Sequence, residues 1–157
     1  MRIGIDAREL LGNRTGVGRY LAALCAEWQG LPPAGPHEFV LYGHVPGDSP
    51  ALLGAPFERE GHGPFRYEAV PGDGGTWWEQ TQFAAAVNAS EPDVLFAPGY
   101  SAPLAARVPV VVTIHDISFE THPEWFPWRE GMRRRWMTRQ SARRAARIVA
   151  VSGFTRD

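Results

Sequence analysis

The chain has 157 residues, 44% of them hydrophobic and 21% charged, which is typical of one globular domain with a core of its own. A formal net charge of −1 argues against generic nucleic-acid binding, and the single cysteine, Cys25, excludes an intramolecular disulfide. The N-terminus lacks the long apolar core of a signal peptide, and no run of about eighteen apolar residues occurs, so we expect a cytoplasmic protein.

Short apolar segments alternate along the chain with amphipathic stretches, which is the pattern of an α/β domain. The predicted strands are Arg2–Ile5, Phe39–Tyr42, Phe65–Val70, Val94–Ala97, Val110–Ile114 and Ile148–Val151. The predicted helices are Gly18–Gln29, Thr76–Ala89 and Trp128–Ala146. Residues 43–64 and 117–127 are expected to form loops. Strands separated by helices favour a Rossmann-like parallel sheet with flanking helices. Cys25 lies in the first helix, where we interpret it as a small buried hydrophobe rather than a reactive thiol.

The most informative strand is Val110–Ile114, an unbroken apolar run that ends in His115 and Asp116. Such runs are typical of strands buried on both faces of a parallel sheet, and open α/β sheets bind ligands beyond the carboxyl ends of their strands. His115 is therefore the best single candidate for chemistry, although a structural role also fits its position. Asp116 faces the other way in an extended chain, so it is not automatically a partner of His115. His122 follows seven residues later, but no Cys or carboxylate cluster completes a metal site, and none is expected.

The segment Asn13–Arg19 joins the first strand to the first helix and is expected to be a loop containing Gly16, Val17, Gly18 and Arg19. Glycines let the backbone come close to a ligand, and N–H groups at a helix N-terminus attract anions. Leu21 occupies the third glycine position of the dinucleotide fingerprint, and no Gly-Lys-Ser/Thr sequence occurs, so neither nucleotide motif is present. A ligand-binding loop and a purely structural turn are both compatible with these residues.

Tyr100 and Ser101 come directly after the strand Val94–Ala97, at the same expected edge of the sheet as His115. Their hydroxyl groups are suited to hydrogen-bond a polyhydroxylated ligand. A structural turn is the alternative interpretation for each of them.

The predicted helix near the C-terminus is rich in arginine. Residues 128–147 contain eight arginines and one acid, Glu130, with Trp125, Trp128 and Trp136 nearby, a combination that suits anionic lipid headgroups. We favour a solvated helix that packs its small residues against the sheet, because the arginines are spread around the helix. Weak peripheral membrane contact stays open as the alternative.

Five segments, in this order and spacing, resemble the N-terminal half of a family 4 retaining glycosyltransferase with the GT-B fold. They are Ile3–Arg8, Thr15–Tyr20, Pro92–Pro98, Thr113–Phe119 and Ile148–Ser152. The resemblance covers essentially the whole chain, and the combination is specific where any one segment would not be. It implies two Rossmann-like domains that face each other across a cleft, the N-terminal one binding the acceptor and the C-terminal one the nucleotide-sugar donor.

The resemblance also implies roles for individual residues. His115 would be the catalytic residue, placed beside the transferred sugar, where it would donate to a sugar hydroxyl or supply its backbone carbonyl near the anomeric centre. Acceptor and phosphate binding would fall to Gly16, Val17, Gly18, Arg19, Tyr100 and Asp116. The implied partners are a nucleotide-sugar donor and a glycan or lipid-linked acceptor, with no nucleic acid, no cofactor and no metal.

The sequence departs from the family pattern in one large respect. The Arg/Lys pair and the Glu-x7-Glu motif of the family belong to the donor-binding domain, and residues 1–157 contain only the N-terminal domain. A helix begun at Ser152 would also have only about one turn before Asp157, too little to be stable alone, so we expect a truncated sequence. We therefore expect the acceptor-binding half of an enzyme, inactive alone, with a non-catalytic glycan- or phosphate-binding module as the alternative.

Overall fold

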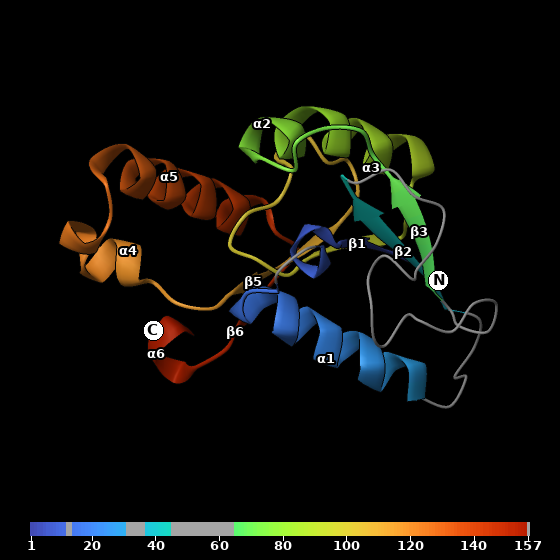
Figure 1. The fold of residues 1–157 in the computed structure, drawn as a ribbon, viewed down its shortest axis with the longest axis horizontal. Helices are drawn as coiled ribbons and strands as arrows, with labels where there is room; N and C mark the ends of the chain where they lie inside the picture. The colour runs from blue at the N-terminus through green and yellow to red at the C-terminus, as the bar shows by residue number, and fades with distance from the viewer. Residues whose placement is uncertain (12–13, 31–36, 45–64, 157) are drawn as a thin grey trace.

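The computed structural model describes residues 1–11, 14–30, 37–44 and 65–156, and its strands form one parallel sheet (Figure 1). The strands are β1 (Arg2–Asp6), β2 (Glu38–Gly43), β3 (Phe65–Ala69), β4 (Val94–Ala97), β5 (Val110–Ile114) and β6 (Arg147–Ala150). Their order across the sheet is β3-β2-β1-β4-β5-β6, and every neighbouring pair is parallel. Each predicted strand is confirmed to within one residue at either end, and so is the Rossmann-like fold class.

Helices cover both faces of the sheet. The longer ones are α1 (Gly16–Gly30), α3 (Ala84–Ser90) and α5 (Trp128–Arg144), and the short ones are α2 (Thr76–Trp78), α4 (Ser118–Thr121) and α6 (Gly153–Arg156). In Figure 1, α1 and α6 lie below the sheet, whereas α2, α3 and α5 lie above it. None of the helices in the described ranges has the length and apolar character needed to cross a bilayer.

The predicted helix at residues 76–89 is confirmed but is not regular, because α2 and α3 are joined by a π-helical segment, η3 (Glu79–Phe83). The predicted loop at residues 117–127 is wrong in part, since it contains α4 and a 3-10 turn, η4 (Pro123–Trp125). The physical reason is a local side-chain hydrogen bond: the Asp116 carboxylate accepts the Ser118 backbone N–H at 2.9 Å and so starts the turn. Of the predicted loop at residues 43–64, residues 45–64 lie outside the described residues.

Two hydrophobic clusters, one on each face, hold the layers together. On one face, Leu21 and Cys25 of α1 pack on a cluster that includes Ile5 and Leu41. On the other face, Trp78, Phe83 and Val87 pack on a cluster that includes Val40, Leu95 and Val112. Alternate residues of the same strand therefore enter opposite clusters, as in a parallel sheet covered on both sides. The interpretation of Cys25 as a buried hydrophobe is confirmed, and burial raises the pKa of its thiol to about 12.

The order in which strands are added to the sheet reverses between β1 and β4. From β1 the chain builds outward through β2 and β3, and from β4 it builds outward the other way through β5 and β6. The connections after β1 and β4 therefore diverge at their carboxyl ends, and this is the topological switch point at which open α/β sheets bind ligands.

Candidate functional site

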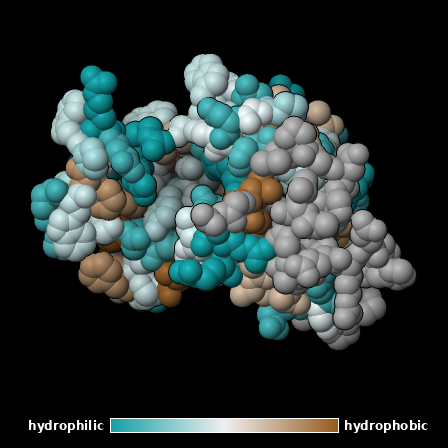
Figure 2. Space-filling model, in the orientation of Figure 1, coloured by the Kyte–Doolittle hydropathy of each residue, from teal (hydrophilic) through white to brown (hydrophobic). Residues whose placement is uncertain are grey.

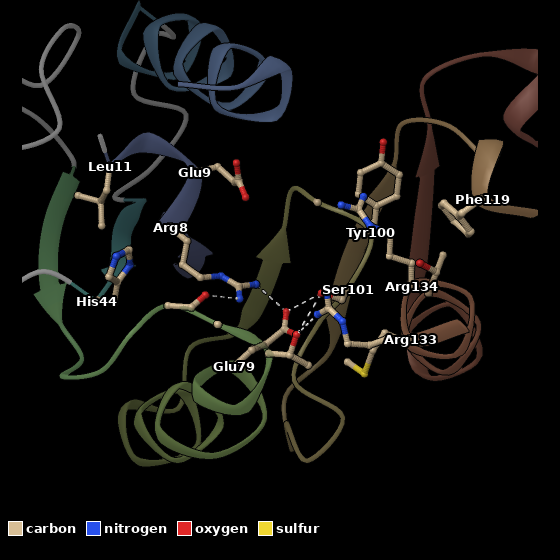
Figure 3. A pocket seen from close by; sticks show the side chains of 16 residues that line it. Arg8, Glu9, Leu11, His44, Glu79, Tyr100, Ser101, Phe119, Arg133 and Arg134 are labelled. Carbon is tan, nitrogen blue, oxygen red and sulfur yellow. Dashed lines mark hydrogen bonds and ion pairs between the residues drawn. The ribbon is translucent and has the colours of Figure 1, made fainter. Parts of the chain in front are cut away.

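A cavity of about 390 Å³ lies at this switch point, on the carboxyl edge of the sheet (Figure 3). Residues that follow β1, β2 and β4 line it, together with α2 and one side of α5. Its polar lining includes Arg8, Glu9, His44, Glu79, Ser101 and Arg133. A concave, partly apolar site with a few convergent polar groups is the usual form of a small-molecule site.

The floor of the cavity is a buried charge network centred on Arg8 (Figure 3). The Nη2 group of Arg8 donates to Asp6 at 2.6 Å and to Glu79 at 2.7 Å, and Nη1 donates to the Gly74 carbonyl at 3.1 Å. Asp6 and Glu79 are only 4% and 1% exposed, and the Arg8 guanidinium also lies 5.4 Å from the Trp78 ring centre. The Arg8 side chain therefore joins three sections of the chain: the end of β1 at Asp6, the segment before α2 at Gly74, and the start of η3 at Glu79.

The electrostatics of the network keep Arg8 charged. Burial alone would disfavour the guanidinium, but the attraction of Asp6 and Glu79 outweighs that cost and raises the pKa of Arg8. The Ser101 hydroxyl donates to the Glu79 carboxylate, whose two oxygens lie 2.8 and 3.0 Å from it. The loop after β4 is therefore held to the same network, and the polar floor of the cavity is pre-organised.

Glu79 owes its position to the π-helical segment, which opens at that residue. Single π turns within α-helices often occur at functional sites. Here the next residue, Gln80, donates to the Ala102 carbonyl at 3.1 Å and accepts the Leu104 N–H at 2.8 Å. Two successive side chains of this segment, Glu79 and Gln80, therefore form hydrogen bonds with the loop after β4. Glu79 was not among the residues predicted from the sequence, where its one signal is an acidic side chain on an otherwise apolar helix face. Arg8 was predicted only as part of a motif.

The walls of the cavity combine aromatic rings with arginines. The rings of Tyr100 and Phe119 lie 5.9 Å apart in an edge-to-face arrangement. From α5, Arg134 forms an ion pair with Glu130 at 2.6 Å, and Arg133 donates to the Thr76 hydroxyl. Hydrogen-bonding groups beside ring faces suit a polyhydroxylated ligand, whose hydroxyls and C–H groups need both.

His115 lies directly after β5 and is fixed on several sides. Its Nε2 is 2.7 Å from the Pro98 carbonyl oxygen, which only accepts, so Nε2 carries the proton and donates. The rings of Tyr20 and Tyr100 lie 5.0 and 5.6 Å from the imidazole. The His115 backbone carbonyl accepts the Thr155 hydroxyl at 3.3 Å. The ring N–H and the backbone carbonyl, the two groups expected to reach the substrate, are therefore both engaged within the protein. In the neutral ring, Nδ1 is left as the acceptor.

Gly16, Val17, Gly18 and Arg19 do not form a loop, because they are the first turn of α1. Thr15 precedes them as the cap, its hydroxyl 3.4 Å from the Gly18 N–H and its carbonyl 3.0 Å from the Arg19 N–H. A Cβ on Gly18 would lie 2.1 Å from the Glu9 carbonyl oxygen, whereas Gly16 has no atom within 4 Å of such a Cβ. Gly18 is therefore explained by packing, and the space above Gly16 is open.

Tyr100 and Asp116 form a hydrogen-bonded pair beside His115. The Tyr100 hydroxyl donates to Asp116 at 2.6 Å, and the Tyr100 backbone is held in the left-handed region at φ 47°. Burial, reinforced by the nearby carboxylate, raises the pKa of Tyr100. Burial also opposes the charge of Asp116, but hydrogen bonds from Ser118 and Tyr100 outweigh it and lower the pKa of this carboxyl. The Asp116 side chain therefore serves Tyr100 and α4 rather than His115.

Most of the predicted site residues meet at the carboxyl ends of β4 and β5. A Cβ on Gly99 would lie 3.3 Å from Val17, and Tyr20 and Tyr100 both pack against His115. Of the predicted residues, Tyr100 and Ser101 line the cavity, and Tyr100 joins it to the His115 side. Arg19 is exposed. Among the described residues, no group of three or more His, Cys, Asp or Glu side chains is placed to hold a metal ion.

A parallel sheet with helices on both faces and a polar cavity at its switch point defines a Rossmann-like domain. The sequence profile of Glycosyltransferase Family 4 matches residues 14–157, and the chain belongs to this family. No curated protein matches the chain. Membership of this family connects the domain with a sugar donor and an acceptor in general terms.

Proposed function

We propose that residues 1–157 form the N-terminal, acceptor-binding domain of a retaining glycosyltransferase with the GT-B fold, working in the cytoplasm. The enzyme would transfer a sugar from a nucleotide-sugar to a glycan or lipid-linked acceptor. The observation that carries the proposal is the polar cavity at the switch point, which adjoins His115 through Tyr100 in a chain of glycosyltransferase family 4.

The acceptor would occupy the cavity. Arg133 supplies donors there, the Ser101 and Glu9 oxygens supply acceptors, and Tyr100 and Phe119 present ring surfaces to the sugar. The buried network beneath them holds Ser101, and with it the loop after β4, in place before the ligand arrives. Pre-organisation of this kind limits the entropy lost on binding and fixes the orientation of the reacting hydroxyl.

His115 would face the transferred sugar with Nδ1, since Nε2 donates to Pro98. A neutral imidazole fixed in this way orients a sugar hydroxyl and acts through its dipole rather than as a strong base. The donor would be bound chiefly by a second domain, because residues 1–157 contain neither the dinucleotide fingerprint nor a Gly-Lys-Ser/Thr sequence. We therefore expect residues 1–157 to bind acceptor analogues but to transfer no sugar on their own.

The test uses the 157-residue chain with methyl α-mannopyranoside and methyl α-glucopyranoside as probes, followed by nuclear magnetic resonance. We expect backbone signals at Tyr100, Ser101 and Arg133 to shift on titration, and Arg133→Gln to weaken binding, with Arg107→Gln as the exposed control. Unaffected cavity signals with either probe would remove the acceptor assignment. Sugar transfer from UDP-glucose or GDP-mannose by the chain alone would overturn the need for a second domain.

The second candidate is a non-catalytic module that binds a glycan or a phosphorylated ligand at the α1 N-terminus. It is favoured by the open space above Gly16 and the exposed Arg19 beside it. Calorimetry with mannose 1-phosphate separates the two candidates. Binding that is lost with Arg19→Gln and unchanged with His115→Ala would favour the module, whereas dependence on His115 would favour the enzyme half.

A further inference from the structure

The outer face of α5 exposes large apolar side chains in a regular row. Trp128, Met132 and Trp136 follow one another at intervals of four residues and are 73%, 48% and 56% exposed. Residues at this spacing lie on one side of a helix. We call this row, with Arg129, Arg139 and Arg143, the outer face of α5. Contiguous exposed aromatic and aliphatic groups of this size usually mark an interaction surface.

Positive charge is concentrated in the same part of the chain. Residues 128–147 hold eight arginines and one acid, a formal charge of +7, whereas the rest of the sequence holds eight arginines and sixteen acids, a charge of −8. The near-neutral total therefore hides a strong separation of charge. Figure 2 shows hydrophilic teal and pale side chains over the part of the molecule that carries α4 and α5.

The arginines of α5 lie on two different sides of the helix, a division that was not predicted from the sequence. Arg133 and Arg134 turn toward the cavity, whereas Arg135, Arg139 and Arg143 line a shallow groove with Met132 and Trp136. Arg139 pairs with Glu120 at 2.9 Å. Within the described part of the chain, Arg129, Arg135 and Arg143 form no ion pair. Their charge is left for an external partner.

We propose that the outer face of α5 binds the surface of an anionic lipid bilayer. Tryptophan is favoured at the headgroup level, where an apolar ring with one polar N–H suits the boundary. Arginines around such rings meet lipid phosphates, while their stems cover apolar surface. A helix of 17 residues is about 25 Å long and lies along the bilayer surface rather than across it. The excess negative charge on the rest of the chain orients this face toward anionic lipid.

This membrane contact is independent of the proposed glycosyl transfer, but it has a consequence that rests on it. The opposite side of α5 lines the cavity with Arg133, Arg134, Met137 and Thr138. Because a helix with its side chains is about 10–12 Å across, the cavity would lie one helix diameter from the lipid. An acceptor anchored in the bilayer would then reach the cavity while its lipid stays in place.

The experiment is co-sedimentation of the chain with vesicles of phosphatidylglycerol and phosphatidylcholine in equal parts, compared with phosphatidylcholine alone. We expect at least about tenfold stronger binding to the anionic vesicles, with a blue shift of tryptophan fluorescence, and loss of binding at about 1 M salt. Arg129→Gln/Arg143→Gln should weaken binding about fivefold per arginine. Trp128→Gln/Trp136→Gln should weaken it and reduce the blue shift.

Matched controls change the same residue types elsewhere. Arg66→Gln/Arg107→Gln removes two exposed charges and Phe154→Gln removes an exposed ring, and both should bind as the unmodified chain does. Circular dichroism establishes that every variant is folded. Equal binding to both vesicle types, or outer-face variants that bind like the controls, would overturn the proposal. Binding to single-stranded DNA with none to anionic vesicles would instead identify a nucleic-acid surface. None of these outcomes depends on sugar transfer.

Discussion

Arg8 is the residue on which the floor of the cavity depends. Replacing it with Met leaves Asp6 and Glu79 buried without a cation, and removing one partner of a buried ionic network costs about 3–5 kcal/mol. We expect that loss for Arg8→Met in urea unfolding. The control is Arg66→Met: the exposed Arg66 lies 3.6 Å from the half-buried Glu68, and there the change should stay below about 1 kcal/mol. Similar losses in the two variants would contradict the structural role of the network.

Asp116 makes a pH-dependent contribution whose sign follows from its lowered pKa. Hydrogen bonds from Ser118 and Tyr100 overcome the opposing effect of burial, so the folded state holds the carboxylate more strongly than the unfolded chain does. The stability this adds is complete above the ordinary pKa of 3.8 and is lost as the pH falls through the lower, folded-state value. In Tyr100→Phe the pKa of Asp116 should therefore rise.

Carbon-13 resonance of the Asp116 carboxyl through an acid titration measures this change directly. Tyr42→Phe is the matched control, because its hydroxyl bonds Ser90 rather than a carboxylate. An Asp116 pKa that is the same in the Tyr100→Phe variant and the unmodified chain would show that the Tyr100 hydrogen bond does not act on the charge.

At the scale of elements, the start of α1 separates two glycines that look equivalent in the sequence. A Cβ on Gly18 would collide with the Glu9 backbone, which belongs to the 3-10 turn η1 (Arg8–Leu10), whereas a Cβ on Gly16 meets nothing. Alanine is the better helix former by about 1 kcal/mol, so propensity alone predicts a gain at either position. We expect Gly18→Ala to lose about 1–3 kcal/mol and Gly16→Ala to be neutral or slightly stabilising.

Thermal unfolding of the two variants under identical conditions distinguishes the roles. Equal effects in Gly16→Ala and Gly18→Ala would mean that the close approach to Glu9 relaxes at little cost. A selective loss of mannose 1-phosphate binding in Gly16→Ala, with stability unchanged, would point to the ligand role instead.

The strands were the part of the fold most readily predicted, because an apolar β-branched run such as Val110–Ile114 has one stable place in an α/β domain. The short turns η1, α4 and η4 were missed, since each has only three or four residues and is too short to show a hydrophobic period. In the candidate site, the role of Glu79 was likewise not predictable from local sequence. Its helix was predicted, but the contact with Arg8 joins residues 71 positions apart.

At the scale of the whole molecule, the two edges of the sheet differ. On the β3 edge, Arg66 and Glu68 interrupt the apolar sequence with charge, as edge strands usually require. On the β6 edge, Ile148 is 50% exposed and Val149 is exposed beside it. An apolar edge with unpaired backbone groups favours association between chains, so we expect self-association of the 157-residue chain at high concentration.

Ile148→Lys should suppress that association, because a charge on an edge strand opposes pairing with another strand. Size-exclusion chromatography with light scattering over a range of concentrations measures it. Trp128→Gln serves as the control, since it removes apolar surface on α5 but leaves β6 unchanged. Association that persists in Ile148→Lys and disappears in Trp128→Gln would place the contact on α5 instead.

The sequence by itself determined the fold class, the position of each strand and the family, because hydrophobic period and local motifs are properties of neighbouring residues. It also placed His115 and Tyr100 at the carboxyl edge of the sheet, the edge at which open α/β sheets generally bind ligands. Only the tertiary structure decided which groups form the cavity and how His115 is bonded. It likewise assigned Gly18 to packing and divided the arginines of α5 between the cavity and the outer face. Such contacts join residues far apart in the chain, and their geometry follows from how the layers pack rather than from any local pattern.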